Sequence, residues 1–405
     1  MSIEHEIFLS YSRKDNVAKN PGGEGWVTAF ERELKTRHRS YSGRELDIFF
    51  DTLSIDIGRD WKRELGAGIR SSRLFIAFLS PNYITSQNCL WEWDEYLRRE
   101  HSAARGDDGI TPIFFVTPSD LTAGEDQRLA AWLEDLNRRN RQHHCELQPW
   151  FERGPEILAE LDAAERSAAV KSSPRAPAED LRTLGERLDA LDRRIAARLD
   201  QIALADLAPG NVVRSHEHFV GRHHELSTLH TLMMTGGPKS GGRGMGGRGM
   251  IAAAHSPGGL GKTALARQYA HAYAGFYAAG GTWEIGCEGV TKLGAALLTL
   301  ADHPQFKSAG RGVLEPLVLS EAERADPDLA AVAVLDYLKR LTFARVTVLR
   351  EALKRHPDRH SPEADLPVIE QPRGLLIFDN VDRAELLRAD QAALLPAEEW
   401  LEVIV

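Results

Sequence analysis

The sequence predicts an α/β chain of two parallel-sheet domains joined by a helical linker. Short apolar runs alternate with longer helical patterns near the N-terminus and again in the second half of the chain. Such alternation predicts parallel strands connected by crossover helices. A glycine-rich turn between a strand and a helix in the second half adds a phosphate-binding signal. At 405 residues the chain has room for two or three domains, each with its own core.

The composition is typical of a soluble globular protein, with 42% hydrophobic and 27% charged residues. A formal net charge of −9 gives no reason to expect a nucleic-acid partner. The sequence has neither a signal peptide nor an apolar run long enough to cross a membrane. Its three cysteines, Cys89, Cys145 and Cys287, are too widely spaced for a disulfide framework. A cytoplasmic location without a membrane partner is therefore expected.

Four apolar runs predict the strands of the first domain. The first run continues into a polar loop, Ser10–Asp15, and the second is followed by a loop that contains Trp61 and opens a helix. Helical patterns separate the runs, so the strands are expected to be parallel. The runs are residues 7–9, 46–51, 74–79 and 113–116.

The segment after the third run predicts a ligand site. Pro81 and Asn82 end the strand and begin a helix, in which Glu92 lies between Trp91 and Trp93. Ligands bind at the carboxyl ends of strands in open α/β sheets. An acid walled by aromatic rings there would be partly desolvated and able to face a cationic substrate. The alternative is a helix with an exposed glutamate and two packing tryptophans.

Motifs in this region resemble the Toll/interleukin-1 receptor (TIR) domain in its bacterial form. They are FLSYSRKD at 8–15, FFDTLSIDIGRDW at 49–61, SPNYITSQNCLWEW at 80–93 and, more weakly, LQPWFERG at 147–154. The resemblance covers about residues 4–165 and implies a flavodoxin-like domain at 1–165.

This resemblance implies that the domain cleaves NAD between nicotinamide and ribose, with Glu92 as the catalytic carboxylate. The leaving group is neutral, so one carboxylate that stabilises an oxocarbenium-like ribose suffices. Asp94 and Glu95 point away from the face of Glu92. The sequence does not decide whether the product is ADP-ribose or a cyclic variant. The implied substrate-binding residues are Ser10, Tyr11, Arg13, Phe50, Asp51, Trp61 and Cys89.

Residues 166–210 are predicted to link the two domains. Ala, Ser, Pro and charged residues dominate 166–179. A helical pattern follows, with apolar residues near heptad spacing at Leu181, Leu184, Leu188, Leu191, Ile195 and Ile202. Two interpretations remain: a short coiled coil, or an amphipathic helix that packs on a neighbouring domain.

The sequence HSPGGLGKT at 255–263 predicts a phosphate-binding loop between a strand at 250–254 and a helix at 264–274. Backbone N–H groups around Gly258, Gly259 and Gly261 would cradle phosphates at the helix N-terminus. Lys262 would reach the β and γ phosphates, and the Thr263 hydroxyl would hold Mg²⁺. Ser256 replaces the first glycine of the usual pattern.

A second buried strand, at 374–378, ends at Asp379, which is placed to bind Mg²⁺ through water. Asn380 follows, where an acid often orients the attacking water. Because asparagine cannot act as a base, ATP hydrolysis is expected to be slow unless Asp382 substitutes.

Four motifs of the second half together resemble STAND-class (NB-ARC-like) P-loop NTPases: FVGRHHEL, HSPGGLGKT, GTWEIGCEG and LLIFDNVD. The resemblance covers 211–405 and implies ATP or ADP with Mg²⁺, with Arg222 near the nucleotide. The last residues, 401–405, predict a further core strand, and the sensor parts that follow in the family are expected to be missing.

The two resemblances together imply an NAD glycohydrolase controlled by a nucleotide-dependent switch. An unknown trigger, sensed by the missing C-terminal region, would drive homo-oligomerisation and complete the NAD sites, in bacterial anti-phage defence. One alternative is a non-catalytic TIR adaptor on an ATP-binding scaffold, although an adaptor does not need Glu92. The other is an ATPase with a vestigial TIR domain.

Overall fold

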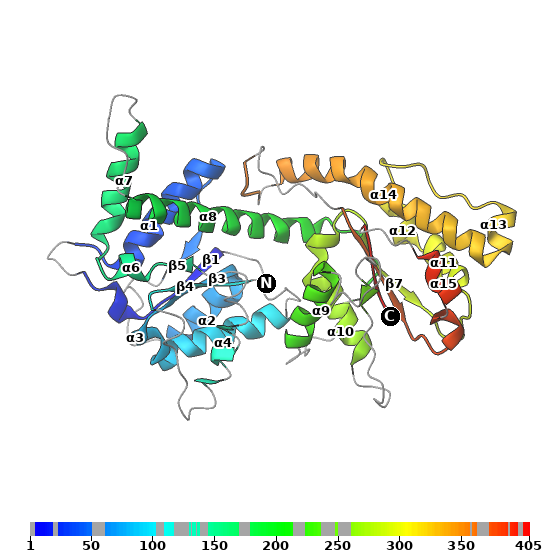
Figure 1. Ribbon diagram of the computed structural model, residues 1–405, viewed down its shortest axis with the longest axis horizontal. Coiled ribbons are helices and arrows are strands. Elements are labelled where there is room, and N and C mark those ends of the chain that lie inside the picture. Colours follow the sequence, from blue (N-terminus) through cyan, green and yellow to red (C-terminus); the bar gives the residue numbers. More distant parts are fainter. Residues whose placement is uncertain are drawn as a thin grey trace. The chain divides into compact units, whose positions relative to one another are not determined.

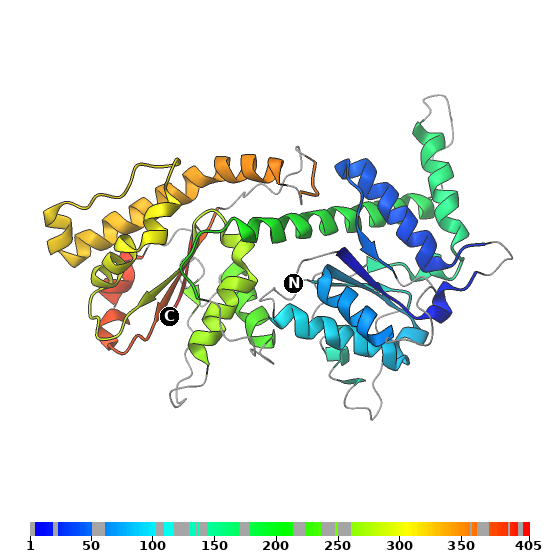
Figure 2. The same ribbon diagram turned by 180° about the vertical axis from the view of Figure 1, so that it is seen from behind.

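The chain forms two compact units in a computed structural model (Figures 1 and 2). The first unit comprises residues 1–100, 107–199 and 360–362, and the second comprises 101–106, 200–359 and 363–405. The structure describes residues 5–18, 23–50, 61–102, 109–116, 129–130, 132–134, 136–137, 145–169, 179–213, 223–235, 248–249, 261–356, 359–362, 372–387, 389–395 and 400–405.

The first unit is built on a five-stranded parallel sheet in the order β2-β1-β3-β4-β5. The central strand, β3, is almost wholly buried, as expected for a parallel sheet with covered faces. Each of the four predicted strands has a counterpart, but the second is only two residues long and the fourth ends at Phe114, so the predicted residues Phe115 and Val116 lie beyond it. The strands are β1 His5–Ser10, β2 Ile48–Phe49, β3 Ser72–Leu79, β4 Ile110–Phe114 and β5 Cys145–Glu146.

Helices connect these strands, and their positions follow local sequence signals. The helix predicted to follow the loop that contains Trp61 begins at Trp61 itself. The first long helix ends at Gly43, whose left-handed φ of 75° suits glycine and lets its N–H bond the carbonyl of Arg39. The helical elements are η1 Arg13–Asn16, α1 Trp26–Ser42, α2 Trp61–Ser71, α3 Pro81–Ile84, α4 Gln87–Ser102, α6 Gln148–Phe151 and α7 Glu156–Ala169.

The predicted linker helix is a single long helix, α8 (Glu179–Asp206), whose residues up to 199 belong to the first unit. Its apolar stripe is buried, including Leu184, Leu188, Leu191 and Ile195. This burial agrees with the amphipathic-helix interpretation, because the stripe packs within the chain. The stripe continues at Leu199 rather than at the heptad position of Arg198.

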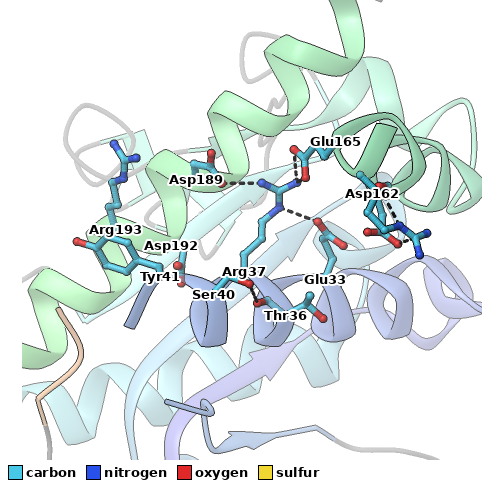
Figure 3. A pocket seen from close by; sticks show the side chains of 11 residues that line it. Glu33, Thr36, Arg37, Ser40, Tyr41, Asp162, Glu165, Asp189, Asp192 and Arg193 are labelled. Carbon is cyan, nitrogen blue, oxygen red and sulfur yellow. Dashed lines mark hydrogen bonds and ion pairs between the residues drawn. The ribbon is translucent and has the colours of Figure 1, made fainter. Parts of the chain in front are cut away.

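A charged cavity of about 470 Å³ lies among α1, α7 and α8 (Figure 3). At its centre the guanidinium of Arg37, only 9% exposed, donates to carboxylates of Glu33 at 2.6 Å, Asp189 at 2.6 Å and Glu165 at 2.8 Å. Burial raises the pKa of Glu33, helped by the charge of Glu165 and opposed by Arg37. One cation therefore joins three helices of this unit.

A chain of buried titratable groups lies nearby. The imidazole of His38 contacts Asp192 through Nδ1 at 2.8 Å and His360 through Nε2 at 3.2 Å. Nε2 of His360 lies 3.0 Å from Glu6 on β1. Burial opposes ionisation of Glu6, but the contact with His360, the N–H of Asp47 and the charge of Arg44 together lower the pKa of that carboxyl. These contacts explain why residues 360–362 group with the first unit.

The second unit holds a parallel sheet in the order β6-β9-β8-β7. The strands predicted at 374–378 and 401–405 are confirmed as β8 Gly374–Asp379 and β9 Leu401–Ile404. The predicted strand at 250–254 lies outside the described residues, whereas Arg248–Gly249 form β6 and Gly281–Gly286 form β7. Alternate side chains of β8 enter two cores, Leu375 with Tyr269 on one face and Leu376 with Trp283 on the other.

Helices flank this sheet (Figure 1). The helix after the glycine-rich turn begins at Lys262, two residues earlier than predicted. The helical elements are α9 His223–Thr235, α10 Lys262–Ala272, η3 Ala274–Tyr277, α11 Leu293–Asp302, α12 Pro304–Ala309, α13 Glu321–Ala325, α14 Pro327–Arg355, η5 Ala384–Leu387 and α15 Ala389–Leu394. Among the described residues, none of the helices has the length and apolar character needed to cross a bilayer.

The Arg37 contacts predict a stability effect. Replacing Arg37 with Met keeps the aliphatic bulk but leaves three carboxylates facing one another, so the free energy of unfolding should fall by about 1–3 kcal/mol. Arg32→Met, on the exposed side of the same helix, should change it by no more than about 0.5 kcal/mol. Urea unfolding of the full chain, followed by tryptophan fluorescence, measures both. Equal effects of the two substitutions would contradict a joining role for Arg37.

Candidate active site

The candidate acid lies beyond the carboxyl ends of β1 and β3, two neighbouring parallel strands. Ser10 is the last residue of β1, and β3 ends at Leu79. The hydroxyl of Ser80 then caps α3 by accepting from the N–H of Tyr83 at 3.0 Å. The next helix, α4, carries Glu92. The strand order therefore brings Ser10, Tyr83 and Glu92 together at one edge of the sheet.

Glu92 is a largely buried carboxylate, only 8% exposed. The Ser10 hydroxyl donates to Oε2 of Glu92 at 2.6 Å. The hydroxyls of Ser10 and Tyr83 lie 2.9 Å apart, and both residues are fully buried. Hydrogen bonds of this kind offset part of the cost of burying a charge.

The expectation that two indoles wall the acid needs a correction. Neighbouring residues on a helix do not face the same side. Trp93 packs in the core against Phe75 and Trp132, with ring centroids 6.2 Å and 5.3 Å away. Trp91 is half-buried, with the Lys62 ammonium 5.9 Å from its ring centroid. The Ser10 hydroxyl links the acid to Tyr83, a residue to which the sequence motifs gave no role.

The first loop is tied to the start of α3. Asp15 accepts hydrogen bonds from the Ser80 hydroxyl and, at 2.7 Å, from the amide of Asn82. This loop carries Tyr11, whose ring centroid lies 5.3 Å from that of Phe50, and the exposed Arg13. Asp15 was not among the predicted site residues, although it is the last residue of the first quoted motif. Its carboxylate fixes the loop beside the candidate acid.

The remaining residues predicted for this site differ in where the structure places them. Asp51 and the side chain of Trp61 lie outside the described residues. Cys89 is 3% exposed, and burial together with the charge of Glu92 raises the pKa of its thiol to about 12. Glu95 pairs with Arg70 at 2.9 Å. The geometric reason for expecting Glu95 to face away from Glu92 does not hold, because residues three apart on a helix are neighbours on one face.

In the second unit the predicted Mg²⁺ ligands are adjacent. The Thr263 hydroxyl donates to Oδ1 of Asp379 at 2.6 Å, which joins the first turn of α10 to the end of β8. Gly261, just before α10, has a left-handed φ of 73° that favours glycine. Lys262 is exposed at the helix start. The predicted residues Arg222, Gly258 and Gly259 lie outside the described residues.

The residues around Asp379 add two features. Arg267, one helical turn after Thr263, bonds Glu284 at 2.8 Å and lies 4.0 Å from Asp379. Arg267 was not predicted from the sequence, although the four-residue spacing from Thr263 was a usable signal. Asp382 accepts from the backbone N–H of Gly289 at 2.9 Å, so its carboxylate is engaged in holding a loop.

Residues 7–124 match the family described as TIR domain. This part of the chain is a TIR domain. A 98-residue segment, 24% of the chain, is 31% identical to the NAD(+) hydrolase TirS of Staphylococcus aureus (strain MSSA476) and spans 30% of that protein. A solved structure of the TIR domains in the activated Roq1 resistosome directly recognizing the pathogen effector XopQ matches at 18% identity with a TM-score of 0.28, covering 40% of this chain and 99% of that one. The resemblance to STAND-class NTPases stays a prediction.

Burial predicts unreactive thiols in both units of the chain. Burial raises the pKa of Cys89 and Cys287 to about 12 and that of Cys145 to about 11. At pH 8 the thiolate fraction is then on the order of 0.1% or less. A thiol-disulfide dye should therefore label less than one thiol per native chain within minutes, and about three in guanidinium chloride. Rapid labelling of Cys89 in the native protein would contradict its buried position.

Proposed function

We propose that the TIR domain is an NAD glycohydrolase with Glu92 as its catalytic carboxylate. The observation that carries the proposal is a buried acid, held by Ser10 at 2.6 Å, at the carboxyl edge of a parallel sheet. Sequence similarity to an NAD(+) hydrolase supports the same chemistry.

The reaction breaks the bond between the pyridinium nitrogen of nicotinamide and C1 of the ribose. The bonding electrons leave with nicotinamide, which becomes neutral and needs no proton. Positive charge then develops on the ribose, where the carboxylate of Glu92 stabilises it. Water adds to C1 and loses a proton to solvent, which gives ADP-ribose.

The substrate-binding roles divide according to burial. Tyr11, Arg13 and Phe50 are the accessible candidates, and the cation of Arg13 suits the diphosphate of NAD. Asp51 and Trp61 are proposed to border the site on the strength of the resemblance alone. Ser10 and Cys89 are buried, so we assign to them the role of holding Glu92 in place rather than of binding the substrate.

Glu92→Gln should abolish this activity, because the amide keeps the shape of the side chain but loses its charge. NAD consumption by the full chain should fall by at least about 100-fold, measured over a range of protein concentrations. Glu95→Gln, on the same helix and away from Ser10, should keep the wild-type rate. Equal activity of the Glu92→Gln variant and the wild type would refute the proposed site. A wild type that leaves NAD intact even when it is concentrated on beads would favour the adaptor alternative.

We further propose that the second unit binds ATP or ADP with Mg²⁺ and that nucleotide binding promotes homo-oligomerisation. The adjacent Thr263 and Asp379, after a left-handed glycine at a helix start, support this proposal. Lys262 would contact the phosphates, and Thr263 and Asp379 would hold the ion, which neutralises phosphate charge when bound. With Asp382 engaged by Gly289 and Asn380 unable to act as a base, the site suits slow turnover.

Lys262→Ala should weaken nucleotide binding at least about tenfold, since the variant lacks the charge opposite the phosphates. Titration with a fluorescent ATP analogue, with Mg²⁺ and with a chelator, measures this change. Lys292→Ala, whose lysine instead pairs with Asp328 at 3.0 Å, is the control. Unchanged binding in the Lys262→Ala variant would remove the proposed phosphate site.

A further inference from the structure

We propose that Tyr83 is a positioning residue that acts through Ser10 to orient the carboxylate of Glu92. This inference rests on the proposed function, because it assigns Tyr83 a task in the same reaction. Three groups carry it: a phenol on α3, a hydroxyl at the end of β1 and a carboxylate on α4, linked at 2.9 Å and 2.6 Å.

The direction of the two hydrogen bonds follows from proton counting. An ionised carboxylate can only accept, so the single hydroxyl proton of Ser10 points to Oε2 of Glu92. The oxygen of Ser10 must then accept in its contact with Tyr83, which makes the phenol the donor. Tyr83 thereby prevents the Ser10 hydroxyl from turning away from the carboxylate. Donors in such a chain polarise and strengthen one another.

The phenol is well suited to this task. Its ring is fully buried, with its centroid 6.5 Å from that of Trp132, and its backbone N–H is fixed by the Ser80 cap. Burial, reinforced by the charges of Cys89 and Glu92, raises the pKa of Tyr83 well above its ordinary value. The phenol therefore stays protonated, as a donor must. The carbonyl of Cys89 is a more distant acceptor, at 3.4 Å.

Tyr83→Phe should lower kcat about three- to tenfold with little change in KM, since the phenol does not touch the substrate. A hydrogen bond to the charged carboxylate favours that form, so its weakening should move the acid limb of the kcat profile to higher pH. Tyr96→Phe is the matched control. Its phenol is also buried and donates to the carbonyl of Arg73 at 2.6 Å, and Tyr96 lies on the same helix as Glu92. The Tyr96→Phe variant should show a similar loss in the free energy of unfolding in urea, but the acid limb of its kcat profile should not move.

A double-mutant cycle tests the route through Ser10. If Tyr83 acts through that hydroxyl, adding Tyr83→Phe to Ser10→Ala should cost no further activity. The inference would be overturned if the fold-losses of activity of the two single variants multiplied in the double variant. It would also be overturned if the pH profile of Tyr83→Phe matched that of Tyr96→Phe. These outcomes leave a Glu92-dependent activity in the wild type intact. Absence of NAD cleavage in the wild type would instead refute the proposed function itself.

Discussion

A carboxylate that loses most of its water must receive hydrogen bonds, and the TIR domain meets this need for Glu92 with the hydroxyl of Ser10. The contact depends on the strand order, because β1 supplies the donor and the helix after β3 supplies the acid. The cap of Ser80 and the contacts of Asp15 then fix the loops around it. The loops at this end of the domain are thereby held beside the buried carboxylate.

The second unit applies the same principle of sheet geometry to a different pair. The end of β8 carries Asp379, and the start of α10 carries Thr263, whose hydroxyl reaches it at 2.6 Å. In both units a hydroxyl and a carboxylate meet where parallel strands end. This edge is the usual location of ligand sites in open α/β sheets, since loops and helix N-termini converge there.

The charged cavity of the first unit has a different character. Arg37 and its three carboxylates are already paired with one another, and neither Glu92 nor Ser10 lines the cavity. Its contents fit a structural role, in which a single cation joins α1, α7 and α8. The buried stripe of α8, with Leu188 and Leu191, supplies the apolar part of that association.

The sequence by itself determined the α/β class, six of the nine described strands and the candidate acid, because apolar periodicity and turn residues act locally. It did not predict β5, β6 or β7. Only the tertiary structure decided which groups surround the acid. Residues 10, 83 and 92 are far apart along the chain, and sheet register brings them together. Burial of Trp93 and Cys89 was likewise set by packing across the core, which no local pattern specifies.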